Sequence, residues 1–224
     1  PADPSNVIIT PNSSTQFTLG WNDNSNNETG FKVYISTSAI TSCNTATYPG
    51  VPDYTPGANI LSQIVSGKAI NTQYCAKVIA TNGDGDSGAA YSATPKYTLA
   101  NTPSTPTITT SSTTAINIKI NQNSNPTGPA PVDDTDYAIS CDTDTTFLNY
   151  TTNACEAIAD DSDHWRTYTN WGGALGFEDI GLSINTLHTY KVIARNGDNT
   201  NTGLSSGDSK YTHANAPGVP TVNA

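Results

Sequence analysis

The chain contains one strand-like segment twice. The sequence INTQYCAKVIATNG occupies residues 70–83, and INTLHTYKVIARNG occupies residues 184–197. Nine of the fourteen positions are identical without a gap, at a separation of 184 − 70 = 114 residues. Self-similarity at this spacing is typical of tandem domains, so we expect each copy to be the central strand of its own domain.

A second repeated segment predicts where the domains begin and end. KYTLANTP at 96–103 matches KYTHANAP at 210–217, again 114 residues apart. A Pro-x-x-Pro start follows each of them, and the chain itself opens with one. We therefore predict three regions: a first domain at 1–101, a second domain with longer loops at 102–216, and a linker or the first strand of a following repeat at 217–224.

Alternating side chains predict β-strands in both copies. Phe17, Leu19 and Trp21 alternate with polar residues before a polar turn segment. The alternation recurs at Phe31, Val33 and Ile35; at Tyr74, Ala76, Val78 and Ala80; at Ile116, Ile118 and Ile120; at Tyr137, Ile139 and Cys141; and at His188, Tyr190, Val192 and Ala194. Only 12% of residues are charged, and turn residues recur every ten or so positions. The pattern predicts an all-β chain of two-sheet sandwiches.

These runs resemble a known family. The segments at 19–36 and 71–88 are similar to a fibronectin type III domain of the bacterial extracellular kind. Trp21 matches the family's core tryptophan on the second strand. Tyr74, followed by Val78, Ala80 and Asn82, matches its penultimate strand. In the second copy the match covers 177–197, so the resemblance implies two tandem immunoglobulin-like sandwiches over nearly the whole chain.

The second copy departs from this pattern. Ile120 replaces the core tryptophan, His188 replaces the tyrosine, and the stretch 126–171 is longer and richer in Asp and aromatic residues. Tyr190 lies on the same face as His188 and can supply the missing aromatic bulk. We expect His188 to fill the tyrosine position and to donate one hydrogen bond. A metal ligand or a pH switch is the alternative.

The four cysteines predict disulfides and an oxidising compartment. Two lie in each copy, and none forms a C-x-x-C pair that would favour zinc. Sequence alone allows three pairings. We expect Cys43 to pair with Cys75 and Cys141 with Cys155, because each repeat should fold alone.

Charge and hydropathy exclude several kinds of partner. Nineteen acidic and nine basic residues give a net charge of −10, which disfavours nucleic acid and anionic membrane surfaces. No apolar run approaches the ~20 residues of a membrane helix. We expect no membrane insertion in this segment, and we expect any targeting segment to lie outside these 224 residues.

No catalytic pattern stands out. GDSGAA at 85–90 resembles the nucleophile motif of trypsin-like proteases, but that family places its histidine base ahead of the serine, and no histidine precedes His164. Ser87 also falls where a hairpin turn is expected. We therefore predict that the segment is not an enzyme.

Calcium is the one cofactor for which the sequence offers candidate ligands. Asn82, Asp84 and Asp86 carry oxygens at alternate positions, but they lack the glutamate of a calcium loop. The second copy is denser in acid, and its candidate site is Asp160, Asp161 and Asp163. A bound cation would relieve repulsion among them, whereas solvated loops also carry such runs.

The segment HWRTYTNWGG places three aromatic residues close together: Trp165, Tyr168 and Trp171. If they are exposed, they form a platform for sugar rings or an interface with a neighbouring subunit. If they are buried, at least one replaces the core volume lost at Ile120. The sequence favours packing in the core or at a sheet edge.

These features predict a structural segment of an extracellular or cell-surface protein: a stalk, an adhesin or a filament subunit that assembles head to tail. Its partners would be other copies of itself or neighbouring repeats. The alternatives are a carbohydrate- or ligand-binding module that uses the aromatic and acidic loop of the second domain, or a spacer in a large secreted enzyme. The predicted assembly residues are Pro217, Pro220 and Val222, because 216–224 repeats the start of each earlier unit.

Overall fold

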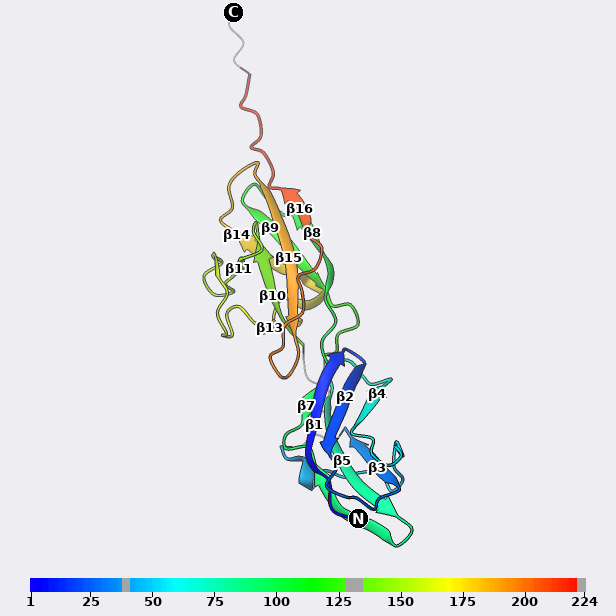
Figure 1. Cartoon of the computed structure of the whole chain (residues 1–224). Coiled ribbons are helices and arrows are strands. Elements are labelled where there is room, and N and C mark those ends of the chain that lie inside the picture. The colour runs from blue at the N-terminus through cyan, green and yellow to red at the C-terminus, as the bar shows by residue number, and fades with distance from the viewer. Residues whose placement is uncertain (38–40, 128–134, 221–224) are drawn as a thin grey trace, which may run out of the picture. The chain divides into compact units, whose positions relative to one another are not determined.

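A computed structural model of the chain describes residues 1–37, 41–127 and 135–220, and these form two compact units (Figure 1). Unit 1 comprises Pro1–Asn101, Ser124–Thr135 and Arg195–Thr202. Unit 2 comprises Thr102–Asn123, Asp136–Ala194 and Gly203–Ala224. Each unit is built around two antiparallel sheets, which confirms the all-β prediction.

Two sheets form the sandwich of unit 1. Its strands are β1 Ser5–Ser13, β2 Gln16–Asn22, β3 Gly30–Ser36, β4 Ser62–Ser66, β5 Gln73–Asn82, β6 Gly85–Tyr91 and β7 Lys96–Tyr97. One sheet has the order β1-β2-β4, and the other has the order β3-β5-β6 with β7 also paired to β5. The predicted central strand is β5, which is hydrogen-bonded to neighbours on both edges.

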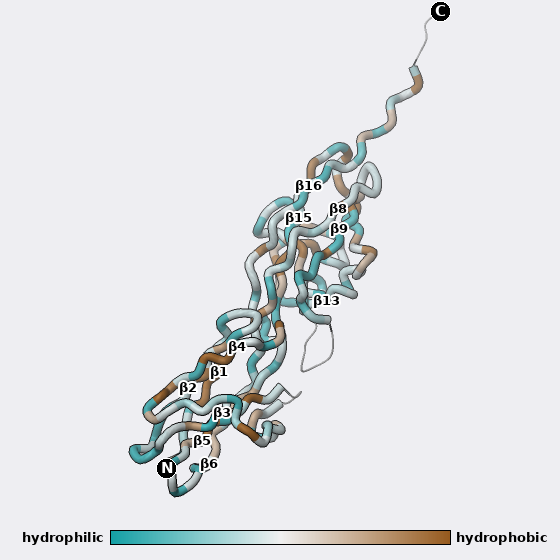
Figure 2. The backbone as a smooth tube through the Cα atoms, turned by 90° about the vertical axis from the view of Figure 1, so that its right-hand side faces the viewer, coloured by the Kyte–Doolittle hydropathy of each residue, from teal (hydrophilic) through white to brown (hydrophobic). Residues whose placement is uncertain are grey.

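The core of unit 1 follows the predicted alternation. Phe17, Leu19 and Trp21 of β2 lie in one hydrophobic cluster with Tyr74 and Val78 of β5, and all are at most 4% exposed. The Trp21 and Phe31 ring centroids lie 5.4 Å apart, and so do those of Phe17 and Tyr74. Figure 2 shows a strongly hydrophobic stretch at β1, where Val7 and Ile9 join the same cluster.

Unit 2 repeats this sandwich with additional strands. Its strands are β8 Ser104–Thr110, β9 Ala115–Asn121, β10 Asp136–Cys141, β11 Thr146–Leu148, β12 Cys155–Ala157, β13 Arg166–Thr167, β14 Phe177–Ile180, β15 Leu187–Arg195 and β16 Asp208–Tyr211. One sheet has the order β14-β9-β8, and the other has the order β12-β11-β10-β15-β16, with β13 paired to β10. The register confirms that Ile120 takes the place of Trp21, because Asn121 pairs with Ser104 as Asn22 pairs with Ser5.

Two of the additional strands, β11 and β13, pair with β10, and side chains of the added stretch cover the outer face of β10. Ala138 of β10 and Phe147 of β11 form a second hydrophobic cluster with Trp165, which precedes β13. Ile193 and Leu204 pack against this cluster. As a result, β10 is buried on both faces, and only its first residue is partly exposed. The long stretch between β10 and β14 therefore folds as a second layer of core.

Helix is confined to two short 3₁₀ turns among the described residues, Cys43–Thr45 and Gly173–Leu175. No described helix has the length and apolar character needed to cross a membrane.

Gly30 gives a direct test of the packing in unit 1. A Cβ atom on Gly30 would lie 2.7 Å from the carbonyl oxygen of Pro56, which is held by a 2.8 Å hydrogen bond from the Phe31 amide. We expect Gly30→Ala to lower the free energy of unfolding by about 1–3 kcal/mol, because the two backbones must move apart. Urea unfolding monitored by Trp fluorescence measures this change.

Gly57 is the matched control because it bridges to Gly30, yet nothing lies within 4 Å of the Cβ it lacks. Gly57→Ala should leave stability unchanged or raise it by up to about 1 kcal/mol. Equal destabilisation by the two variants would contradict this account of the Gly30 contact.

Candidate binding and assembly surfaces

Both disulfides pair as predicted. Cys43 is bonded to Cys75 with a Cα–Cα distance of 5.3 Å, and Cys141 is bonded to Cys155 with a Cα–Cα distance of 6.1 Å. The first bond ties the 3₁₀ turn after β3 to β5, and the second ties β10 to β12. The prediction that each copy carries its own bridge is confirmed.

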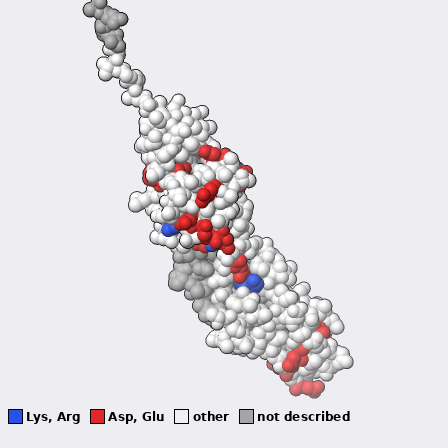
Figure 3. All heavy atoms as spheres, turned by 90° about the vertical axis from the view of Figure 1, so that its left-hand side faces the viewer, with Lys and Arg blue, Asp and Glu red and all other residues white. Residues whose placement is uncertain are grey.

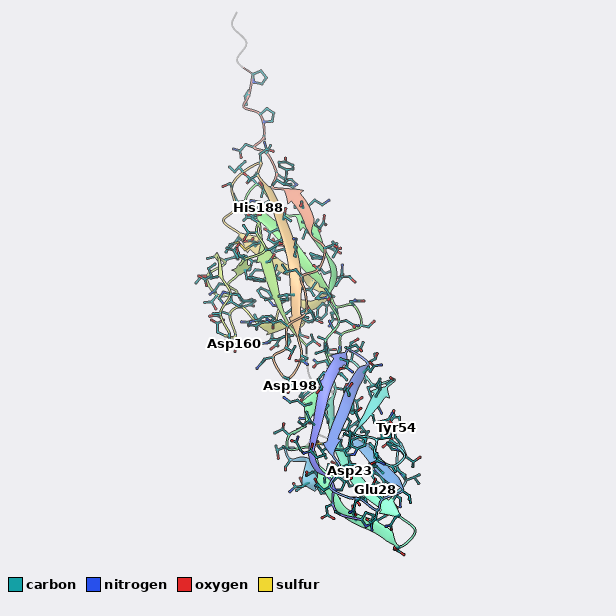
Figure 4. The ribbon with its side chains drawn as sticks, viewed as in Figure 1. Asp23, Glu28, Tyr54, Asp160, His188 and Asp198 are labelled. Carbon is teal, nitrogen blue, oxygen red and sulfur yellow. A yellow bond between two sulfur atoms is a disulfide. The ribbon has the colours of Figure 1, made fainter. Side chains whose placement is uncertain are left out.

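Tyr74 and His188 occupy equivalent places in the two sandwiches. The Tyr74 hydroxyl oxygen accepts a 3.0 Å hydrogen bond from the Ala69 amide. His188 lies on β15 (Figure 4), is 9% exposed, and has its Nδ1 atom 3.0 Å from Asp142 Oδ2. Asp142 Oδ1 also accepts a hydrogen bond from the Thr189 amide. The histidine therefore keeps a polar partner at the position where the first copy uses a phenol.

A buried acid lies beside this histidine. Asp179 is 1% exposed, and its Oδ2 atom accepts a 2.7 Å hydrogen bond from the Tyr190 hydroxyl. Burial raises the pKa of Asp179 above its ordinary value of 3.8, although the bond from Tyr190 and the nearby His188 act in the opposite direction. Burial and the bond to Asp179 also raise the pKa of the Tyr190 phenol. Tyr190 thus fills the core as predicted and satisfies a buried carboxyl.

The predicted aromatic platform is mostly buried. Trp165 is 6% exposed and Trp171 is 1% exposed, while Tyr168 is half-buried. Trp171 donates a 2.8 Å hydrogen bond from Nε1 to the Tyr137 carbonyl oxygen and meets the Phe177 ring edge-on at 5.0 Å. The two tryptophans therefore pack in the protein interior and present no stacking surface. This burial agrees with the core packing that the sequence favours for Trp165 and Trp171 and disfavours the alternative of a ligand surface.

The exposed aromatic side chain in this region is that of Tyr150, which is 37% exposed. Its ring packs against Trp171 and Phe177, at 5.7 and 5.3 Å. The Arg166 guanidinium lies 3.6 Å from the ring centroid and covers it by a cation–π contact. The remaining aromatic surface is therefore small.

In the acidic loop, the Asp161 and Asp163 carboxylates each have a hydrogen-bond partner close by in the chain. Asp161 accepts a 2.8 Å hydrogen bond from the ring of the buried His164, which lowers the pKa of the Asp161 carboxyl. Asp163 accepts a 2.7 Å hydrogen bond from the Thr151 hydroxyl, and Asp160 lies on the outer loop (Figure 4). Across residues 1–37, 41–127 and 135–220, no three His, Cys, Asp or Glu side chains converge as metal ligands do. A calcium site at Asp160, Asp161 and Asp163 stays a prediction.

The protease-like and calcium-like motifs of the first copy form a hairpin. The Ser87 hydroxyl donates to the Gly88 carbonyl oxygen and accepts from the Ala80 amide at 2.9 Å. Asp86 forms a 2.8 Å ion pair with Lys32. A cation at Asp86 would compete with this lysine, so the local charges disfavour calcium there.

Acidic side chains dominate the exposed charge. Figure 3 shows more Asp and Glu than Lys and Arg on the face that it presents, in line with the net charge of −10. The predicted assembly residues Pro217 and Pro220 are exposed and outside any strand, while Val222 lies outside the described residues.

Sequence reasoning missed a polar contact within unit 1. We name its two parts corner 1 and turn 2: corner 1 is Asn71, Thr72, Tyr97 and Thr98, and turn 2 is Asn196, Gly197 and Asp198. Gly197 N donates to Asn71 Oδ1 at 2.8 Å, Asn196 Nδ2 donates to the Thr98 carbonyl oxygen at 3.1 Å, and Tyr97 N donates to Asp198 Oδ2 at 2.9 Å.

The contact between corner 1 and turn 2 has further support from charge and burial. Lys96 Nζ lies 3.7 Å from Asp198 Oδ1, and Asn71 Nδ2 donates to the Thr135 hydroxyl oxygen at 3.1 Å. Asn71 is 0% exposed and Asn196 is 3% exposed. The sequence signal was present, because Asn-Thr, Lys-Tyr-Thr and Asn-Gly-Asp occur in both copies.

Solved structures with the same architecture include a two-domain fibronectin type III segment from chicken tenascin. It aligns with 94% of this chain and 99% of its own length, with a TM-score of 0.51 and 13% sequence identity. The chain has the fold of two tandem fibronectin type III domains. The FN1–FN3 domains of chicken CNTN1 also align, over 95% of this chain and 67% of theirs, with a TM-score of 0.33 and 17% identity. Neither a family model nor a curated protein matches the sequence.

The fibronectin type III fold confirms the predicted resemblance, while the bacterial origin of the domains stays a prediction. Within this fold, Tyr74 and His188 occupy the same place on the penultimate conserved strand.

Asp179 gives a pH test of the second domain. Because burial raises its folded-state pKa, the folded protein retains the proton to higher pH than the unfolded chain does. Stability from this group is fully present below the ordinary pKa of 3.8 and is lost as pH rises through the folded-state value. In Asp179→Asn the amide oxygen still accepts from Tyr190, so we expect this loss to disappear.

The measurement is the free energy of unfolding in urea across a pH series. The difference in favour of Asp179→Asn should grow as pH rises above 3.8 and then level off. Asp144→Asn, at a largely exposed carboxylate paired with Lys191, is the control. If the free energy of unfolding changes with pH in the same way for Asp179→Asn and for the unmodified protein, the raised pKa of Asp179 is contradicted.

Proposed function

We propose that this chain is a non-enzymatic structural segment of an extracellular or cell-surface protein, and that it assembles head to tail. The observation that carries the proposal is the fold itself: two tandem fibronectin type III domains, each with its own disulfide. Each such domain is a compact link, and domains joined in series form an array of links. A stalk, an adhesin or a filament subunit is built from links of this kind.

The disulfides support an extracellular location. Disulfides persist in oxidising compartments and are rare where thiols are kept reduced. The described part of the chain has no free cysteine. Its negative surface, which Figure 3 shows on one face, favours solubility of an array outside the cell.

A non-enzymatic role fits the way in which the polar side chains are used. The Ser87 hydroxyl links the strands of a hairpin by a hydrogen bond. His188, a buried residue of the second domain, is hydrogen-bonded to Asp142. His164 is buried beside Asp161. Each of these groups has a structural partner, and none is paired with a nucleophile in the described residues.

The tail supports contact with another copy. Residues 213–220 are exposed and lie outside any strand, and Val219 is 94% exposed. Their sequence repeats the start of each domain, where the equivalent residues enter a first strand. We propose that residues 217–224, with Pro217, Pro220 and Val222, lie against another copy as an added strand.

The alternative of a carbohydrate-binding module rests on the loop of the second domain. Burial of Trp165 and Trp171 removes most of its aromatic surface, and Arg166 covers part of Tyr150. The structural role is therefore the better supported of the two.

Truncation tests the role of the tail. We expect deletion of residues 217–224 to abolish or shorten assemblies, because it removes the added strand. Both domains should keep their melting temperatures, since the described part of the tail packs on neither core. Negative-stain electron microscopy and sedimentation velocity of the two proteins measure the difference. Unchanged assembly after truncation would overturn the role of the tail, and a strictly monomeric full chain at high concentration would favour the binding module.

A further inference from the structure

The second domain ends in a corner with the same structure as corner 1. We name it corner 2, and its residues are Asn185, Thr186, Tyr211 and Thr212. Thr72 N donates to Thr98 Oγ1 at 3.0 Å, and Thr186 N donates to Thr212 Oγ1 at the same distance. Asn71 and Asn185 both adopt left-handed backbone, with φ of 42° and 51°. The sequence therefore builds one polar corner twice.

Asn185 and Tyr211 of corner 2 are exposed, although Thr212 is only 2% exposed, whereas corner 1 is covered. Asn185 is exposed, and its side chain has no hydrogen-bond partner among the residues that the structure describes. Tyr211 is 58% exposed and the neighbouring Ile184 is 44% exposed. The equivalent Tyr97 and Ile70 of the first domain are only partly exposed. Corner 2 thus repeats the donors and acceptors of corner 1, and it has exposed Asn185, Tyr211 and Ile184 side chains beside them.

The first domain carries an exposed copy of turn 2. We name it turn 1, and its residues are Asn82, Gly83 and Asp84. Asp84 N donates to Asn82 Oδ1 at 2.9 Å, as Asp198 N donates to Asn196 Oδ1 at 3.1 Å. The hairpin of turn 1 is shorter, because Asn82 pairs with Gly85. Gly83 and Asp84 are nonetheless exposed, so their amide and carboxylate are open to a partner.

We propose that turn 1 of one molecule docks on corner 2 of a second copy, with the contacts that turn 2 makes on corner 1. Gly83 N then donates to Asn185 Oδ1, and Asn82 Nδ2 donates to the Thr212 carbonyl oxygen. Tyr211 N donates to the Asp84 carboxylate. The Asn82 amide has two hydrogens and uses one on the Asn27 carbonyl oxygen, so the second is available.

Charge and position favour a second copy as the partner. Lys210 stands where Lys96 stands, so it pairs with Asp84 as Lys96 pairs with Asp198. Thr29 precedes β3 as Thr135 precedes β10, and Thr29 is exposed, so its hydroxyl can accept from Asn185 Nδ2. Each copy carries one exposed turn and one exposed corner on different parts of the chain. A contact of this kind is heterologous and propagates from molecule to molecule.

The inference rests on the proposed head-to-tail assembly and names the surfaces that produce it. It predicts that assembly depends on Asp84 and Lys210 rather than on the tail alone. Asp84→Lys and Lys210→Asp each place like charges across the contact, so each variant should lose self-association at least about tenfold. The double variant Asp84→Lys/Lys210→Asp restores opposite charges and should recover part of the loss.

Removal of the corner side chain is a second test. Asn185→Gly keeps the left-handed backbone, because glycine adopts positive φ without strain, and it deletes the side chain that binds Gly83 and Thr29. We expect it to weaken self-association about tenfold. Asn59→Gly is the matched control: Asn59 is exposed, has φ of 60° and lies outside turn 1 and corner 2.

Sedimentation velocity of the full chain over a concentration series up to the millimolar range provides the readout, and circular dichroism checks folding. Loss of association in Asp84→Lys and Asn185→Gly, with partial rescue in the double variant, supports the inference. If these variants associate as strongly as the unmodified chain, the docking of turn 1 on corner 2 is wrong. If only the tail truncation reduces assembly, the proposed function stands without this docking. If the full chain is monomeric at every concentration, both the head-to-tail assembly and the docking of turn 1 on corner 2 are wrong. Corner 2 then does not bind a second copy of this chain.

Discussion

Both domains depend on one strand that is hydrogen-bonded along its edges and apolar on its inward face. In the first domain this strand is β5, whose backbone pairs with β3, β6 and β7. Its inward side chains, from Tyr74 to Ala80, are at most 3% exposed. Buried backbone groups need partners, and a strand in this position obtains them from its neighbours. The rest of each sandwich is arranged around that strand, and nine of the fourteen positions of its segment are identical in the two copies.

The second domain shows how the fold tolerates the loss of a large core side chain. Ile120 replaces Trp21, and the second copy adds β11, β12 and β13. These additions bury Trp165 in an outer cluster and Trp171 against Tyr150 and Phe177. The outer face of β10, which is the side of a sheet that usually meets water, becomes core. The Cys141–Cys155 bond ties β12 to β10.

Sequence patterns predicted the strands because alternation reports directly which side chains face a core. They also predicted both disulfides, since two cysteines in each self-contained repeat leave one pairing within each. The patterns did not place Trp165 and Trp171, because burial of an inserted loop depends on how it folds back over β10 rather than on local spacing. The contact of Asn71 with Gly197 was missed for a similar reason: the two residues are 126 positions apart, and only the fold brings them together. Corner 2 repeats the residues of corner 1, so the contacts of corner 1 indicate what corner 2 can bind.

If the protein bears load, as the proposed function implies, the Cys43–Cys75 bond has a mechanical consequence. It joins residues 32 positions apart, and Cys75 lies in the central strand β5. If tension pulls the first domain open from its ends, the segment inside this covalent loop cannot extend. At about 3.4 Å per extended residue, the bond withholds on the order of 100 Å of length. A thiol reductant would release that length, so the redox state of the surroundings sets how far each link of the chain can stretch before it ruptures.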